Sequence, residues 1–161
     1  MSQERPVNLT RLALKIPPAL IFVIWLAAMA SLRYIFPGLN YTLFLTPFIA
    51  GLFFLLGLFL TLSGFFHFKK AQTTIDPRYP ENTTTIVTTG IYRFSRNPMY
   101  LGFLMWLTAW AFILSNLVGF VFLPLFVFYM NRYQIIPEEK ILHQQFGDIY
   151  YRYLKKVGRW L

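Results

Sequence analysis

The chain has 161 residues, of which 57% are hydrophobic and 20% aromatic, while only 13% are charged. Soluble domains are about one-quarter charged, and a domain of this size cannot bury 18 Phe and 10 Tyr residues in one core. The composition therefore excludes an ordinary soluble domain and predicts a membrane protein. No cysteine is present, which excludes disulfides and zinc–thiolate sites. The net charge of +9 is dispersed between apolar runs, which favours membrane topology over nucleic-acid binding.

Four apolar segments are each close to the roughly 20 residues that a bilayer core requires. They run over 17–36, 47–68, 98–114 and 117 to about 133. The first also resembles a secretory signal with a cleavage site near Ala28-Met29-Ala30-Ser31, but its apolar run continues to Phe36, which favours a retained helix. The last two are short and are separated only by Ser115 and Asn116. They predict a tight helical hairpin that tilts or only just spans.

The positions of Lys and Arg predict the orientation in the membrane. The connection over 37–46 and the Ser115-Asn116 turn carry no charge, whereas the opposite ends of the segments are rich in basic residues. Of the 15 basic residues, only Arg33 lies toward the uncharged side. Since cytoplasmic loops carry an excess of Lys and Arg, we expect both termini and the loop over 69–97 to be cytoplasmic.

The loop over 69–97 ends in a polar, basic turn that runs directly into the third apolar segment. A loop this long in a small protein is usually functional when it is ordered. Its end reads Thr88-Thr89-Gly90-Ile91-Tyr92-Arg93-Phe94-Ser95-Arg96-Asn97-Pro98-Met99-Tyr100. Arg93 and Arg96 are explained equally well as positive-inside anchors. Pro98 marks a helix start, where free backbone N–H groups favour an anion or a carboxylate.

The C-terminal stretch from Pro137 is predicted to be an amphipathic helix lying in the membrane interface. Glu138 and Glu139 complement the dipole of its first turn, and plain helix capping is the alternative reading for both. Arg132 lies near the membrane boundary and needs a partner, which a carboxylate one or two turns away would supply. Because the hairpin returns the chain to one face, we expect this helix to meet the loop end. His67 and His143 are isolated, so no metal site is predicted.

These motifs together carry a family resemblance. They are Thr89-Gly90-Ile91-Tyr92, Arg96-Asn97-Pro98-Met99-Tyr100-Leu101-Gly102, Glu138-Glu139-Lys140-Ile141-Leu142, Phe146-Gly147, Tyr150 and Tyr153. The pattern resembles the isoprenylcysteine carboxyl methyltransferase and phospholipid methyltransferase superfamily over roughly 76–161. The first two helices resemble it only in hydropathy. No two glycines lie two residues apart, so the chain has no G-x-G nucleotide loop, in agreement with a family that lacks a Rossmann domain.

The resemblance implies an all-α integral membrane enzyme of about four transmembrane helices, with a long cytosolic loop and a C-terminal amphipathic helix. One membrane domain over 1–161 would comprise a helical pair (1–68), the loop (69–97) and a catalytic hairpin with the C-terminal helix (98–161). The implied cofactor is S-adenosylmethionine, with S-adenosylhomocysteine as product. The cofactor residues carried over are Thr89, Gly90, Tyr92, Arg96, Asn97, Pro98, Tyr100, Leu101, Gly102, Glu138 and Glu139. The catalytic candidates are Arg132, which would orient the acceptor, and Glu138.

Two departures from the prenylcysteine enzymes leave the methyl acceptor open. Asn97 stands where those enzymes have histidine, and the spacing from Arg132 to Glu138 also differs. We therefore expect methyl transfer to a lipid or another membrane-partitioned small molecule with a carboxylate, amine or thiol acceptor. A non-catalytic membrane protein of the same fold, binding lipid or a partner chain, is the alternative. A transporter or channel subunit is disfavoured, because the apolar segments contain no acidic residue.

Overall fold

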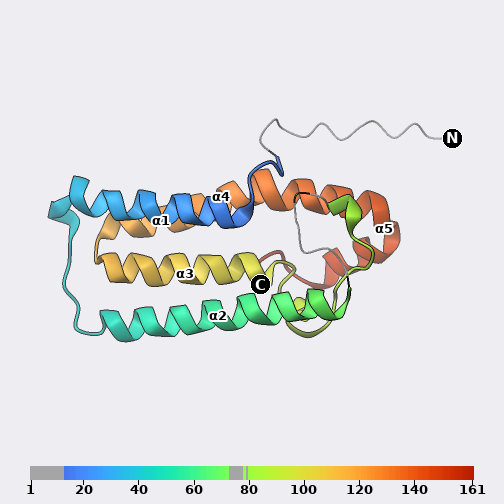
Figure 1. Ribbon diagram of the computed structural model, residues 1–161, viewed down its shortest axis with the longest axis horizontal. Coiled ribbons are helices and arrows are strands. Elements are labelled where there is room, and N and C mark those ends of the chain that lie inside the picture. Colours follow the sequence, from blue (N-terminus) through green and yellow to red (C-terminus); the bar gives the residue numbers. More distant parts are fainter. Residues whose placement is uncertain (1–12, 73–77, 79) are drawn as a thin grey trace.

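The computed structural model describes residues 13–72, 78 and 80–161. Arg5 and Arg11, two of the 15 basic residues used to predict the orientation, and Asp76, where the family resemblance begins, lie outside the described residues. Four long helices form a bundle in which each runs antiparallel to the one before it in the chain, and a fifth lies beyond one end of them (Figure 1). Their bounds are Pro18–Ile35 for α1, Thr46–Lys70 for α2, Pro98–Leu114 for α3, Leu117–Met130 for α4 and Ile136–Lys156 for α5. No β-strand occurs in the described part of the chain, and the fold is all-α, as predicted.

The apolar segments correspond to helices α1 to α4. The bounds of α3 match the prediction, and those of α1 and α2 differ from it by one or two residues. Among the described helices, α1, α2 and the continuous helix that begins with α4 are long and apolar enough to cross a membrane. Helix α3 has 17 residues, a length of about 26 Å at the α-helical rise, slightly below the roughly 30 Å of a bilayer core. The chain is an integral membrane protein.

Small residues allow α2 and α3 to pack closely, and this is the most extensive helix pair. A Cβ atom on Gly57 of α2 would lie 2.9 Å from the carbonyl oxygen of Gly102, and one on Gly102 would lie 2.9 Å from the carbonyl oxygen of Gly57. Each glycine therefore faces the backbone of the other helix. Close backbone approach at small residues is the usual way in which helices associate in lipid.

The apolar core lies between α1, α3 and α4. Fully buried side chains from each of these helices meet there, among them Met29, Leu107 and Phe126. Helix α2 contributes few buried residues. Its outer face instead exposes a series of large apolar side chains: Phe48, Leu52, Leu55, Phe59, Leu62 and Phe66. In a membrane protein these side chains face lipid, where their exposure costs nothing.

A polar clasp joins the two uncharged connections at the end of the bundle away from α5. Asn116 donates to the carbonyl of Phe36 (2.9 Å) and to the side chain of Asn40 (2.7 Å), and its own carbonyl oxygen accepts from the amide of Val118 (3.0 Å). The Arg33 guanidinium donates to the carbonyl of Leu114 at the end of α3. Arg33 therefore satisfies a helix terminus, a role that the sequence analysis did not predict.

The C-terminal helix does not begin anew at Pro137, contrary to the prediction. A π-helical turn over Asn131–Ile135 joins α4 to α5, so the helical path continues from α4 into α5. Gly147, with φ 51° and ψ −126°, then introduces a kink within α5. Pro137 has no N–H and cannot bond to Tyr133, four residues earlier. The amide of Leu14 donates to the carbonyl of Tyr133 instead, at 3.1 Å. The segment before α1 thus supplies the hydrogen bond that Pro137 cannot make, and the helix passes through the proline.

Candidate functional site

Two cavities lie where α5 meets the ends of α2 and α3. The first has a volume of about 70 Å³ and is lined mainly by the segment over 80–87, by Tyr92 and by α5. The second is larger, about 350 Å³, and is lined mainly by apolar residues from the starts of α1 and α3. Five residues line both cavities and form a shared wall: Phe68, Tyr92, Arg96, Asn97 and Glu138. The loop end and the acidic helix therefore meet, as the hairpin predicted.

Glu138 is the acidic residue of the shared wall. It accepts a hydrogen bond from the Tyr100 hydroxyl at 3.3 Å, and no ion pair joins it to any residue in the described ranges. Burial, with a smaller contribution from the neighbouring Glu139 carboxylate, raises the pKa of Glu138 to about 8, although the hydrogen bond from Tyr100 opposes this rise. Glu138 is thus a carboxyl group whose ionisation falls near neutral pH, where it can exchange a proton.

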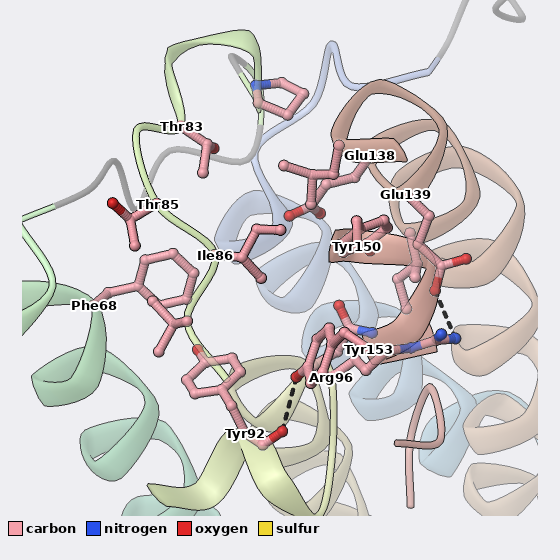
Figure 2. Close-up of a pocket in the computed structure, with 15 residues that line it drawn as sticks. Phe68, Thr83, Thr85, Ile86, Tyr92, Arg96, Glu138, Glu139, Tyr150 and Tyr153 are labelled. Carbon is pink, nitrogen blue, oxygen red and sulfur yellow. Dashed lines mark hydrogen bonds and ion pairs between the residues drawn. The ribbon is translucent and has the colours of Figure 1, made fainter. Parts of the chain in front are cut away.

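Glu139 has a different environment from Glu138. Its carboxylate lies 2.9 Å from Nη2 of Arg96, and Arg159 binds both of its oxygens, at 3.1 and 2.6 Å. Figure 2 shows the Glu138 carboxylate on the side of Thr83 and Ile86, whereas the Glu139 carboxylate lies toward Arg96. A carboxylate held by two guanidinium groups is strongly fixed. Glu139 therefore holds Arg96 and Arg159 in place, whereas the Glu138 carboxyl lines both cavities without such a partner.

Arg96 is held from three sides but retains one free donor. Its backbone amide donates to the carbonyl of Gly158 (3.0 Å), and its Nη1 donates to the carbonyl of Leu154 (3.3 Å). Its Nε is buried and has no partner among the described residues. A buried N–H of a cation without an acceptor is costly, and an anionic group of a ligand in the adjoining cavities would satisfy it. Among the five buried side-chain atoms without a partner in the described residues, it is the one that belongs to a charged residue and to a residue that lines both cavities.

Three buried tyrosines line the first cavity: Tyr92 from the turn before α3, and Tyr150 and Tyr153 from α5. The Tyr153 hydroxyl donates to the carbonyl of Tyr92 at 2.8 Å and so ties α5 to the turn before α3 (Figure 2). Burial raises the pKa of Tyr92, Tyr150 and Tyr153 well above the usual value, so all three are neutral phenols at neutral pH. Their rings give the first cavity an aromatic lining with few charges.

Gly90 allows the end of α2 to reach the turn before α3. Its φ is +60°, a left-handed conformation that glycine adopts without strain. A Cβ atom here would also collide with the His67 ring, which packs against Tyr92 at 6.5 Å between ring centroids. The requirement for glycine at this position therefore has two physical causes. His67, which the sequence analysis noted only as an isolated histidine, lies against Tyr92 of the shared wall.

The segment over 80–87 covers the first cavity and was not predicted as part of the site. It contributes Pro80, Thr83, Thr85, Ile86 and Val87. The side chain of Gln145 on α5 donates to the carbonyls of Thr83 (2.7 Å) and Glu81 (3.3 Å), which holds the segment over the cavity. The threonine-rich sequence of this segment does not predict its position over the cavity, because that position depends on contact with α5.

Comparison with known proteins places this arrangement in a family. The family model described as phospholipid methyltransferase matches residues 45–149, which is most of the chain. The chain belongs to this family. The match begins at the start of α2 and extends into α5, so it includes every element that lines the shared wall.

Individual relatives of this phospholipid methyltransferase family member match shorter stretches. An uncharacterized protein of Haemophilus influenzae is 43% identical over 63 residues, which are 39% of this chain and all of that protein. The protein-S-isoprenylcysteine O-methyltransferases of Schizosaccharomyces pombe and Saccharomyces cerevisiae are 38% and 40% identical, over 45% and 48% of this chain. The chain spans 30% and 33% of the length of those two enzymes. No solved structure gives a significant match.

The structure separates the predicted site residues of this family member into two groups. Those that line a cavity are Tyr92, Arg96, Asn97, Tyr100, Glu138 and Glu139. Those that line neither are Thr89, Gly90, Pro98, Leu101, Gly102 and Arg132. Of the second group, Gly90 and Gly102 instead lie close to α2: Gly90 against the His67 ring and Gly102 against the backbone of Gly57. Residues that the sequence analysis missed include Phe68, Tyr150 and Tyr153 of the first cavity and Met99 and Phe103 of the second.

The expected pairing of Arg132 with a glutamate is wrong. Arg132 is exposed, and within the described ranges the Glu139 carboxylate pairs with Arg96 and Arg159. Arg132 lies six residues before Glu138 on one continuous helical path. At 3.6 residues per turn, positions six apart lie on different faces of a helix. The cation that meets the acidic pair comes from the turn before α3.

Proposed function

We propose that the protein transfers a methyl group from S-adenosylmethionine to a lipid or another membrane-partitioned small molecule. The observation that carries this proposal is the shared wall: an ionisable carboxyl, Glu138, and a cation with a free donor, Arg96, each line two adjoining cavities. Methyl transfer requires two molecules held in contact and in line. Two cavities with a common wall, in a chain of the phospholipid methyltransferase family, suit that requirement.

The residues of the first cavity fit the chemical groups of the cofactor. The unpartnered Nε of Arg96 would bind the carboxylate, and Glu138 would bind the amino group. The rings of Tyr92 and Tyr150 offer aromatic faces to the sulfonium. Bound S-adenosylmethionine supplies an activated methyl group on that sulfonium. The volume of about 70 Å³ is below the roughly 300 Å³ of small-molecule sites, so binding would displace the segment over 80–87 from its closed position.

The second cavity suits the methyl acceptor. Its volume of about 350 Å³ lies in the range of ligand sites, and it is lined by apolar groups that include Pro17, Met99 and Phe103. A carboxylate acceptor would need no base. An amine or thiol acceptor would have to lose a proton, and Glu138 lines this cavity with a pKa of about 8. The second cavity therefore suits both acceptor classes.

We propose further that the site faces the cytoplasm. The cavities lie at the end of the bundle that carries His67, Lys69 and Lys70, whereas the connections at the opposite end are uncharged. The excess of Lys and Arg on cytoplasmic segments supports a cytoplasmic position for both termini and the site. Labelling of single cysteines, introduced at Gly38 and at Lys156 of this cysteine-free chain, in intact cells with an impermeant reagent tests the orientation.

Calorimetry with S-adenosylmethionine and S-adenosylhomocysteine on purified protein in detergent tests the cofactor. We expect the wild type to bind both compounds and Glu138→Gln to bind at least about tenfold more weakly, because a charge-assisted hydrogen bond is lost. The matched control is Asp148→Asn, which removes an exposed carboxylate from the same helix. Absence of binding to the wild type would refute the proposed activity.

The acceptor is identified by incubating the membrane protein with isotopically labelled cofactor and lipid extract. Mass spectrometry then shows which lipid class gains the label. We expect label in an apolar compound, and Phe103→Trp, which fills the second cavity, should reduce labelling without weakening cofactor binding. Label appearing only in water-soluble compounds would contradict the assignment of the second cavity.

A further inference from the structure

The five residues after α5 return to the site and do not extend away from it. Val157 is extended, with φ −126° and ψ 132°. The carbonyl of Gly158 then accepts from the amide of Arg96 (3.0 Å), and the carbonyl of Arg159 accepts from the side chain of Asn97 (3.0 Å). We refer to residues 157–161 as the C-terminal return. Its backbone is hydrogen-bonded to two consecutive residues of the wall that the cavities share.

A second attachment fixes the C-terminal return to the π-helical turn. The indole N–H of Trp160 donates to the side-chain oxygen of Asn131 at 3.0 Å, and the ring packs against the apolar core. Arg159 lies between these attachments, so its backbone is fixed on both sides. A side chain on such a support can hold a partner with little loss of conformational entropy.

The Arg159 guanidinium occupies both oxygens of Glu139. Its Nε lies 3.1 Å from Oε1 and its Nη2 lies 2.6 Å from Oε2, the two-point geometry that arginine favours with carboxylates. Arg96 reaches only Oε1, through its Nη2 at 2.9 Å. The Nε of Arg96 therefore stays without a partner among the described residues. If Oε2 became vacant, Arg96 would gain by turning to bind Glu139 at two points.

We infer that Arg159 is a positioning residue, which by occupying Glu139 keeps the free donor of Arg96 available to the carboxylate of a bound nucleoside cofactor. This inference rests on the proposed function, because it names the group that Arg96 would bind. Arg159 itself lines neither cavity and would act only through Glu139 and Arg96.

The test compares two ligands that differ in the amino-acid group, which carries the carboxylate. S-adenosylhomocysteine carries an amino-acid group, and 5′-methylthioadenosine has the same nucleoside without it. In Arg159→Gln we expect affinity for S-adenosylhomocysteine to fall about tenfold or more, and affinity for 5′-methylthioadenosine to change less than about twofold. Arg159→Lys keeps the charge but loses the two-point geometry, so it should show an intermediate, equally selective loss.

Lys156→Gln is the matched control, since it removes an exposed cation from the same end of the chain, and it should bind both ligands as the wild type does. Equal loss for both ligands in Arg159→Gln would mean that Arg159 only supports the fold, and unchanged affinity would mean that it has no part in the site. Either result overturns the inference. Should Arg159→Gln fail to fold, the ratio of the two affinity losses, for S-adenosylhomocysteine and for 5′-methylthioadenosine, is measured in Arg159→Lys instead. A wild type that binds neither ligand refutes the proposed function, and the inference with it.

Discussion

The two ends of the helical bundle both carry buried polar side chains, but they differ in what those side chains contact. At the far end, the Asn116 amide is satisfied at both its nitrogen and its oxygen, and Arg33 binds the last carbonyl of α3. At the α5 end, Arg96 keeps an unpartnered Nε and Glu138 has no ion pair in the described part of the chain. The Asn116 and Arg33 side chains thus make their hydrogen bonds within the fold, although Tyr41 and Thr46 at the same end each keep a buried hydroxyl without a partner. Arg96 and Glu138 differ from these residues in that they line the two cavities.

This difference teaches that buried polar groups can hold a structure together or prepare it for a ligand, and that a missing partner points to a ligand only where the group also lines a cavity. The far end should therefore respond to mutation through stability. The α5 end should respond through binding, with little loss or even a gain of stability. Four predictions test that contrast, in order of decreasing effect.

Asn116→Ala should cause the largest loss of stability. The change removes three hydrogen bonds of 2.7 to 3.0 Å and leaves the amide of Val118 without its partner, whereas the carbonyl of Phe36 keeps its bond from the amide of Leu39. We expect the free energy of unfolding to fall by about 3 kcal/mol, measured by titration with a denaturing detergent. Cofactor affinity of the folded fraction should not change. A large loss of affinity here would remove the distinction between the two ends.

Glu138→Gln should do the reverse. Ligand affinity is expected to fall by about 2 kcal/mol, while the midpoint of unfolding at pH 9 should rise, because a buried charge is replaced by a neutral amide. The two quantities are measured on the same preparation, by calorimetry and by thermal unfolding. A stability loss comparable to that of Asn116→Ala would indicate that Glu138 belongs to the scaffold.

The unfolding free energy of the wild type should decrease as the pH rises from about 4.5 to about 8. Burial raises the pKa of Glu138 from 4.5 to about 8, so the folded state holds this proton over a range in which the unfolded state has lost it. The stability that the proton provides is complete below pH 4.5 and is lost as the pH passes through 8. After allowance for water in the cavity, we expect about 2 kcal/mol. In Glu138→Gln this component of the pH profile should be missing.

Gln145→Ala should have the smallest effect. It removes the two hydrogen bonds that hold the segment over 80–87 above the first cavity, each worth about 1 kcal/mol at most in an exposed position. We expect cofactor to dissociate a few times faster in stopped-flow measurements, with unchanged thermal stability. Slower dissociation would show that the segment does not cover the path by which the cofactor leaves.

Much of this architecture follows from local sequence signals. Apolar runs bounded by Pro98 or by the Lys69-Lys70 pair predict the helices, because lipid sets their length and the transition to charge marks their ends. The meeting of Asn97 with Glu138 followed from a short hairpin that returns the chain to one face. In both cases the signal lies within the segment concerned, so no knowledge of distant contacts was needed.

The remaining features depend on contacts between distant segments. Pro137 suggested a helix start, but the amide of Leu14 compensates for its missing donor and lets the helix continue. Because the helix continues through Pro137, Arg132 lies on a different face of it from Glu138. Arg159, which the sequence analysis did not single out, binds Glu139 because the chain turns back after α5. Such placements are fixed by tertiary hydrogen bonds, which leave no periodicity in the sequence.

The π-helical turn over Asn131–Ile135 also sets the rotational phase of everything that follows it. A π turn accommodates one more residue than an α turn, and each residue rotates an α-helix by about 100°. Deleting a single residue here would leave α5 intact as a helix but would aim its acidic pair at a different neighbour. The direction in which the acidic pair points is thus set by the number of residues in a backbone irregularity, independently of which side chains occupy it.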